Sequence, residues 1–152
     1  AADPAPAVAA MSSLGVLTRI MPGASDTQLA PLIHSEKLLA LDPDPIRRFA
    51  VLGGQDTPKR LRFSKTQARR YDLLQQNMYA TNDPAALGYR LGQAAALDVV
   101  ALRAAQSSRP PPKATPADIE RGSKAQFPIQ AVDLQPALIA SCLKYSSKRS
   151  RS

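Results

Sequence analysis

Aspartate-proline pairs recur along the chain, and each stands directly before apolar residues that are spaced as in a helix. Three such pairs are Asp3-Pro4, Asp44-Pro45 and Asp83-Pro84, and a fourth, Asp42-Pro43, directly precedes the second of them. Aspartate caps free N–H groups at a helix N-terminus, and proline suits the first helical position because its missing N–H would have no partner there. Ser64 and Gln67 form a capping-box pattern before a further stretch. The sequence therefore predicts four helix starts.

Apolar residues after these starts recur every three or four positions, which is the period of an α-helix. We expect helices over 4–21, 25–42, 45–52, 65–78 and 84–106, with no alternation typical of strands. Aromatic residues make up only 5% of the chain and tryptophan is absent, so the core must consist of Leu, Ala, Val and Ile. That composition favours helices over a sheet. The predicted fold is all-α, an irregular bundle of about five to seven helices.

The positions of the prolines predict how the chain is divided into parts. Residues 1–106 are expected to form a helical body, and the proline-rich residues 107–118 a linker or exposed loop. Residues 119–145 are expected to form a small tail element, with an extended stretch at 127–129. Residues 146–152 contain only Ser, Lys and Arg, a composition typical of disorder.

Basic residues give the chain a net charge of +8 and a pI of about 10.1, which indicates a polyanionic partner such as RNA. The charge is uneven, since residues 47–70 carry eight basic side chains and one acidic one. A helix N-terminus after Ser64 would suit a phosphate beside them. The plainer alternative is a solvated helix face. The predicted RNA-binding residues are Arg47, Arg48, Lys59, Arg60, Arg62, Lys65, Arg69 and Arg70.

Residues for catalysis or metal binding are sparse. His34 and Cys142 are the only histidine and cysteine, so neither a Cys/His metal cluster nor a nucleophile–histidine motif can be assembled. Asp42 and Asp44 are close enough to bind Mg²⁺, but a helix cap explains Asp44. We expect no catalytic residue, no metal and no cofactor in this chain. A lone cysteine fits a reducing compartment, either a bacterial cytoplasm or a mitochondrial matrix, and neither a membrane span nor a signal peptide is expected.

Several short motifs, taken in order, resemble the tRNA nucleotidyltransferase and poly(A) polymerase family. They span nearly the whole chain, and the ordered set carries the resemblance more than any one motif. They are DPAPA at 3–7, GVL at 15–17, MP at 21–22, RLRFSK at 60–65, YRLG at 89–92, FPI at 127–129 and DL at 133–134.

The resemblance implies a body and tail that hold tRNA or other RNA while a catalytic head adds CCA or adenylate to the RNA 3′ end. In the family, the head carries the Mg²⁺ and ATP or CTP sites, and a helical neck selects the incoming base. Neither pattern occurs here, so residue 1 is expected to fall after the neck. On its own the chain would not be an enzyme, although its parent protein would be a nucleotidyltransferase.

The C-terminus departs from the family pattern. Ala131 and Val132 precede Asp133 where the family usually has glycine, and the segment after Lys144 is basic and polar. An alternative therefore stays open, in which the chain is a non-catalytic helical interaction subunit of a larger assembly. The choice between CCA addition and poly(A) synthesis also stays open.

Overall fold

The computed structural model describes residues 3–125, and helices account for most of that part of the chain. The helices are α1 (Ala5–Ser13), α2 (Val16–Ile20), α3 (Leu29–Leu38), α4 (Pro45–Leu52), α5 (Thr57–Arg60), α6 (Lys65–Met78), α7 (Pro84–Leu91), α8 (Gln93–Ser107) and α9 (Thr115–Lys124). Over 3–125 the only pairing of β type is one isolated bridge between Ala24 and Gly53. The predicted all-α class is confirmed.

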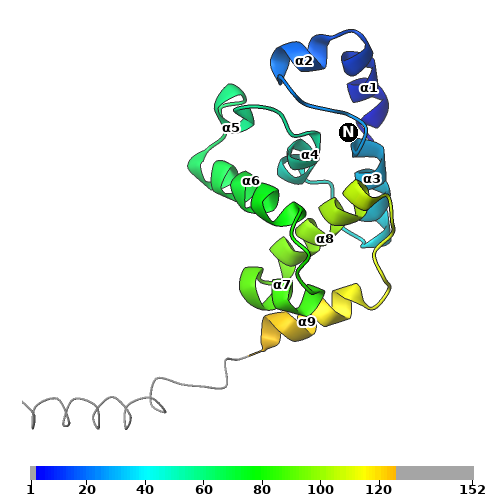
Figure 1. Ribbon diagram of the computed structural model, residues 1–152, viewed down its shortest axis with the longest axis vertical. Helices are drawn as coiled ribbons and strands as arrows, with labels where there is room; N and C mark the ends of the chain where they lie inside the picture. Colours follow the sequence, from blue (N-terminus) through cyan, green and yellow to red (C-terminus); the bar gives the residue numbers. More distant parts are fainter. Residues whose placement is uncertain (1–2, 126–152) are drawn as a thin grey trace, which may run out of the picture.

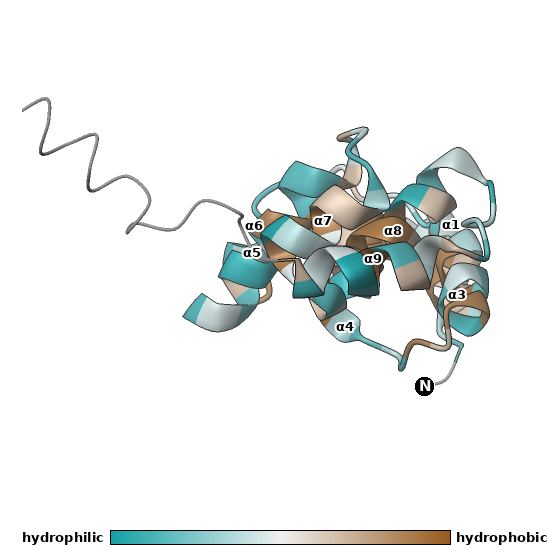
Figure 2. Ribbon diagram, turned by 90° about the horizontal axis from the view of Figure 1, so that it is seen from below, coloured by the Kyte–Doolittle hydropathy of each residue, from teal (hydrophilic) through white to brown (hydrophobic). Residues whose placement is uncertain are grey.

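Helix α8 forms the centre of the body and contacts α3, α4, α6, α7 and α9 (Figure 1). Its buried face includes Ala96, Val99, Ala101, Leu102 and Ala105, and Figure 2 shows this helix as an apolar core between more polar neighbours. Small alanine side chains let the surrounding helices approach closely, so a chain with few aromatic residues can still build a dense core.

The predicted helix starts at Asp44, Ser64 and Asp83 are confirmed, whereas α1 begins one residue later than predicted, with Pro4 and not Asp3 as its N-cap. Asp44 Oδ1 accepts a hydrogen bond from the Arg47 N–H (2.8 Å), and Asp83 Oδ2 accepts one from the Ala85 N–H (3.0 Å). Asp3 Oδ1 accepts from the Ala5 N–H (3.0 Å), and Ser64 and Gln67 form the full capping box. These signals are local, so they act whatever the tertiary contacts are.

Two expected helices are each divided by a glycine, and together with α5 and α9 this gives nine helices over residues 3–125, above the expected five to seven. The expected helix over 84–106 is split at Gly92, whose backbone has φ +78° and ψ 166°. The expected helix over 4–21 is split at Gly15, at φ +71°. Glycine accepts positive φ without a steric penalty, so it ends a helix where an alanine would continue it.

Helix α9 begins inside the segment that was expected to be a linker, and it belongs to the body. It packs on α7 so closely that a Cβ at Gly88 would collide with the Ile119 carbonyl, and a Cβ at Gly122 with the Ala85 carbonyl. Ile119 is fully buried in this contact. The boundary expected at 107–118 therefore does not separate α9 from the core. The expectations for 127–145 and 146–152, including those for Cys142, lie outside the described residues.

Candidate nucleic-acid interface

The eight basic residues predicted to bind RNA divide into two groups with different surroundings. Arg47, Arg48 and Arg70 join an ion-pair network inside the body. The other five have exposed side chains along α5 and the first turns of α6. We call these five the basic strip: Lys59, Arg60, Arg62, Lys65 and Arg69.

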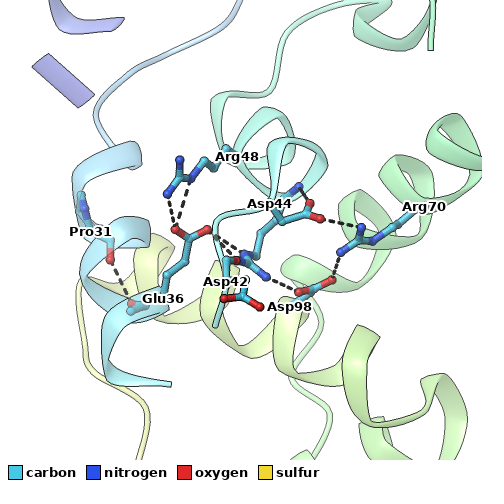
Figure 3. A network of polar contacts seen from close by, with 9 residues as sticks. Pro31, Glu36, Asp42, Asp44, Arg48, Arg70 and Asp98 are labelled. Atoms are coloured by element: carbon cyan, nitrogen blue, oxygen red, sulfur yellow. Dashed lines mark hydrogen bonds and ion pairs between the residues drawn. The ribbon is translucent and has the colours of Figure 1, made fainter. Parts of the chain in front are cut away.

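Arg47 is the centre of the ion-pair network. Figure 3 labels the residues around it, Glu36, Arg48, Asp98 and Arg70 among them. The Arg47 side chain is 3% exposed and lies between Glu36 of α3 and Asp98 of α8, at 2.9 Å and 2.5 Å. Its guanidinium also donates to the Asp42 carbonyl. A buried arginine is stable only when its donors are matched in this way, because an unpaired buried charge is very costly.

Arg48 and Arg70 extend the network to either side of Arg47. Arg48 pairs with the second oxygen of Glu36 at 2.8 Å. Arg70, on α6, pairs with Asp44 at 2.8 Å and with Asp98 at 2.6 Å. The network therefore connects α3, α4, α6 and α8, and two of its carboxylates, Glu36 and Asp98, are each shared between two arginines.

The network also shifts two pKa values. Partial burial works to raise the pKa of the Asp44 carboxyl, but the Arg47 N–H and the Arg70 guanidinium outweigh it and hold this pKa below its usual value. Burial works to lower the pKa of Arg70, but Asp98 and Asp44 raise it overall. Both groups stay charged near neutral pH, so the ion pairs persist there.

These contacts revise part of the predicted site. Arg47 is buried and fully engaged, so the expectation that it contacts RNA conflicts with its position. Arg48 is 12% exposed and pairs with Glu36, and Arg70 is 42% exposed with both of its terminal nitrogens engaged. The three arginines connect helices to one another. Of the eight basic residues predicted to bind RNA, only those of the basic strip are exposed without an ion-pair partner in the described range.

The basic strip is fixed to the core by the apolar residues that alternate with it. Leu61 and Phe63 are partly buried between Arg60, Arg62 and Ser64, which are exposed. The Phe63 ring packs on Phe49 at 5.7 Å and on Tyr71 at 5.9 Å between ring centroids. This alternation directs the cations outward while the backbone between them is held against the body.

Arg62 has a left-handed backbone, with φ +51°. The turn ends α5, with the Arg62 N–H donating to the Lys59 carbonyl (3.2 Å) and the Phe63 N–H to the Pro58 carbonyl (2.9 Å). Glycine or asparagine is favoured at such a position, and arginine costs about 1 kcal/mol or more there. Ala40 and Ser108 have the same geometry after the ends of α3 and α8, so the left-handed backbone of Arg62 belongs to the turn that ends α5.

No member of the basic strip makes a side-chain hydrogen bond or ion pair with another residue of the described range 3–125. The strip also lies beside the N-terminus of α6, whose macrodipole adds positive potential. Five exposed cations without acidic partners form a surface that attracts a polyanion.

Other candidate chemistry is weak in the described part of the chain. No group of three His, Cys, Asp or Glu residues there is arranged to hold a metal ion. Asp44 is both a helix cap and an ion-pair partner of Arg70, and His34 is exposed on α3. No helix among these residues has the length and apolar character that a bilayer crossing requires.

Sequence reasoning missed the acidic half of the network. Asp98 is buried on α8, directly before Val99 and Val100. An acidic residue inside an apolar helical stripe was the available signal, because such a residue needs a buried cation. Its partners are distant in sequence, so the signal does not identify them.

Comparison of the chain with family models, with curated proteins and with solved structures finds no match.

Proposed function

We propose that this chain binds RNA through the sugar-phosphate backbone, and that the basic strip carries the contacts. The observation behind the proposal is that all five cations are exposed and lack acidic partners within 3–125, while the three neighbouring arginines are engaged in the network. Arginine and lysine contacts to phosphates position an RNA without reading its sequence. RNA affinity should therefore be steeply salt-dependent, since each neutralised phosphate releases counterions.

A salt titration with a matched pair of variants tests the proposal. The chain is titrated with tRNA and with an unrelated RNA at several salt concentrations. Lys65→Ala with Arg69→Ala removes two cations from the basic strip, and the slope of log affinity against log salt should flatten by about 0.7 for each lost contact to single-stranded RNA. Arg121→Ala with Lys124→Ala removes two equally exposed cations from α9, where Asp118 and Glu120 already pair with them. This control should leave the slope unchanged.

Two results would contradict the proposal. One is the absence of measurable RNA binding at low salt. The other is an equal loss of slope in the α9 control, which would mean that net charge alone is responsible. The helical interaction subunit would then be favoured, since Leu14, Val16 and Ile20 of the α1–α2 region are exposed apolar residues of the kind that mark protein contacts.

The link to nucleotide addition rests on the ordered motifs. The RLRFSK motif at 60–65 coincides with the centre of the basic strip, so the element that resembles the family is also the element proposed to hold RNA. With tRNA, ATP, CTP and Mg²⁺ supplied, we expect the chain alone to incorporate no nucleotide. Incorporation by the pure chain would contradict the expected absence of a catalytic head.

A further inference from the structure

A polar cavity of about 600 Å³ borders the side of α6 next to the basic strip. One wall includes Gly23, Ser25 and residues 50–54. Its two segments are joined by hydrogen bonds from the Ser25 N–H to the Leu52 carbonyl (2.9 Å) and from the Gln55 N–H to the Pro22 carbonyl (2.8 Å). The opposite wall is α6, with Tyr71, Asp72 and Gln75. The volume falls in the range of small-molecule sites, about 300–1,000 Å³.

Hydrogen-bond acceptors without partners distinguish this cavity. Asp72 is exposed and makes no ion pair or hydrogen bond with any other residue of the described range. Gln28 also lines the cavity, and its Oε1 is buried without a hydrogen-bond partner in that range. The Gln75 amide is already fixed, since its nitrogen donates to the Ala50 carbonyl and to the Tyr71 hydroxyl. The cavity is therefore suited to a ligand that donates hydrogen bonds.

The position of Asp72 relates the cavity to the strip. Arg69 and Asp72 are three residues apart on α6, so their Cβ atoms are about 5–6 Å apart on one side of the helix. A phosphate held by Arg69 therefore places its own nucleotide beside Asp72. Tyr79, 71% exposed, also lines the cavity and offers a ring on which a base can stack.

We propose that this cavity receives an unstacked guanine of a single-stranded RNA whose backbone lies on the basic strip. The inference rests on the proposed RNA binding and adds a base preference to it. Guanine presents two neighbouring donors, N1–H and the N2 amino group, which match the two oxygens of the Asp72 carboxylate. Adenine and cytosine place an acceptor nitrogen beside their amino group, and uracil flanks its single N–H with carbonyls. A cationic ligand is disfavoured because the strip repels it.

The test compares two RNA ligands by fluorescence anisotropy at one salt concentration. One is oligouridine, and the other is the same oligouridine with a single central guanosine. We expect the guanosine-containing RNA to bind about tenfold more tightly, since a bidentate base contact gives discrimination of that order. Asp72→Asn should abolish the preference for the guanosine-containing RNA. The asparagine NH₂ group is itself a hydrogen-bond donor, so it would face a donor of guanine where the carboxylate offers an acceptor. This variant should also raise the affinity for oligouridine slightly, since a negative charge beside the strip is lost.

Matched variants separate the base contact from general charge and from folding. Asp56→Asn removes another exposed carboxylate near the strip, outside the cavity, and should leave the ratio of the two affinities unchanged. Tyr79→Ala should weaken binding of the guanosine-containing RNA, and Tyr79→Phe should restore it. Tyr89→Ala, on another exposed tyrosine, which lies on α7, should have no effect on the ratio.

The outcomes distinguish the two proposals. If both RNAs bind equally and with a steep salt dependence, or if Asp72→Asn keeps the preference, the guanine site is wrong and backbone binding stands. If neither RNA binds at low salt, the proposed function fails, and the guanine site fails with it.

Discussion

Arg69 and Arg70 are neighbours in the sequence, but they differ in almost every structural respect. Arg70 bonds to Asp44 and Asp98, and its contacts connect α6 with α8 and with the start of α4. Arg69 lies on the exposed side of the same helix, without a hydrogen-bond or ion-pair partner in the described range. The same side chain therefore serves the fold at one position and is available to a ligand at the next.

The same contrast holds between the whole ion-pair network and the basic strip. In the network, the carboxylates of Glu36, Asp44 and Asp98 form ion pairs with three arginines of α4 and α6. Within residues 3–125 no acid forms an ion pair with the strip, so its charge stays on the surface. The charge of a sequence segment thus does not predict the charge of a surface, because partners distant in sequence decide which cations remain accessible.

Removal of the central arginine should produce the largest effect on stability. Arg47→Ala leaves Glu36 and Asp98 buried beside it with fewer partners, and loss of one member of a buried ion pair typically costs about 3–5 kcal/mol. We expect a loss of this size in the free energy of unfolding, measured by urea denaturation. A loss below about 1 kcal/mol would mean that the network contributes little to the fold.

A combined variant controls for the lost volume and the stranded charges. Arg47→Met with Glu36→Gln and Asp98→Asn removes the arginine together with both carboxylates. Because buried ion pairs can often be replaced by neutral groups at little cost, this variant should be more stable than Arg47→Ala. The opposite order would show that the pairs of Glu36 with Arg48 and of Asp98 with Arg70, which the combined variant also removes, outweigh the cost of the stranded carboxylates.

Asp98→Asn should rank second in its effect on stability. Asp98 is 4% exposed and accepts hydrogen bonds from both Arg47 and Arg70, so its loss removes two charge-assisted bonds. We expect a decrease of about 2–3 kcal/mol in the free energy of unfolding. Asp56→Asn is the matched control, and as an exposed position it should stay within about 0.5 kcal/mol of the wild type. Similar values for the two variants would contradict the contrast between buried and exposed charges.

Local signals in this sequence predicted local structure well. The caps at Asp44, Ser64 and Asp83 each act within a few residues, and the structure has a helix start at each. The break at Gly92 was missed because a 3.6-residue period continues across it, so the apolar pattern alone did not distinguish one helix from two. The contact between α7 and α9 was missed for another reason, since two glycines far apart in sequence make it.

Prediction of the candidate site was also limited by contacts between residues that are distant in sequence. The density of charge drew attention to residues 47–70, but it did not distinguish Arg47 from Arg62. Only the fold brings Glu36 and Asp98 to Arg47, across 11 and 51 residues of sequence. Asp72 and the cavity beside it were not predicted either. The cavity is formed by segments that are distant in sequence, so the sequence around Asp72 does not indicate it.

A pair of single variants compares Arg70 with Arg69 directly. Arg70→Ala should lower the free energy of unfolding by about 1–2 kcal/mol, less than the Arg47 variant, because Arg70 is partly exposed to solvent. Arg69→Ala should change it by less than about 0.5 kcal/mol. RNA binding should respond in the opposite order, with the salt slope reduced by Arg69→Ala and little affected by Arg70→Ala. Equal effects on the slope would place both arginines on the RNA.

The smallest effect is expected in the acid range, at Asp44. Since the pKa of this carboxyl is lowered in the folded chain, its ionised form stabilises the fold at pH values above its ordinary pKa of 3.8. That contribution should be lost as the pH falls through the lower, folded-state pKa. Melting temperatures recorded from neutral pH down to about pH 2 should therefore fall less steeply for Asp44→Asn than for the wild type. Asp56→Asn, which removes a carboxylate outside the network, should follow the wild-type curve. An unchanged slope in Asp44→Asn would show that ionisation of Asp44, through its bonds with the Arg47 N–H and with Arg70, adds nothing to stability.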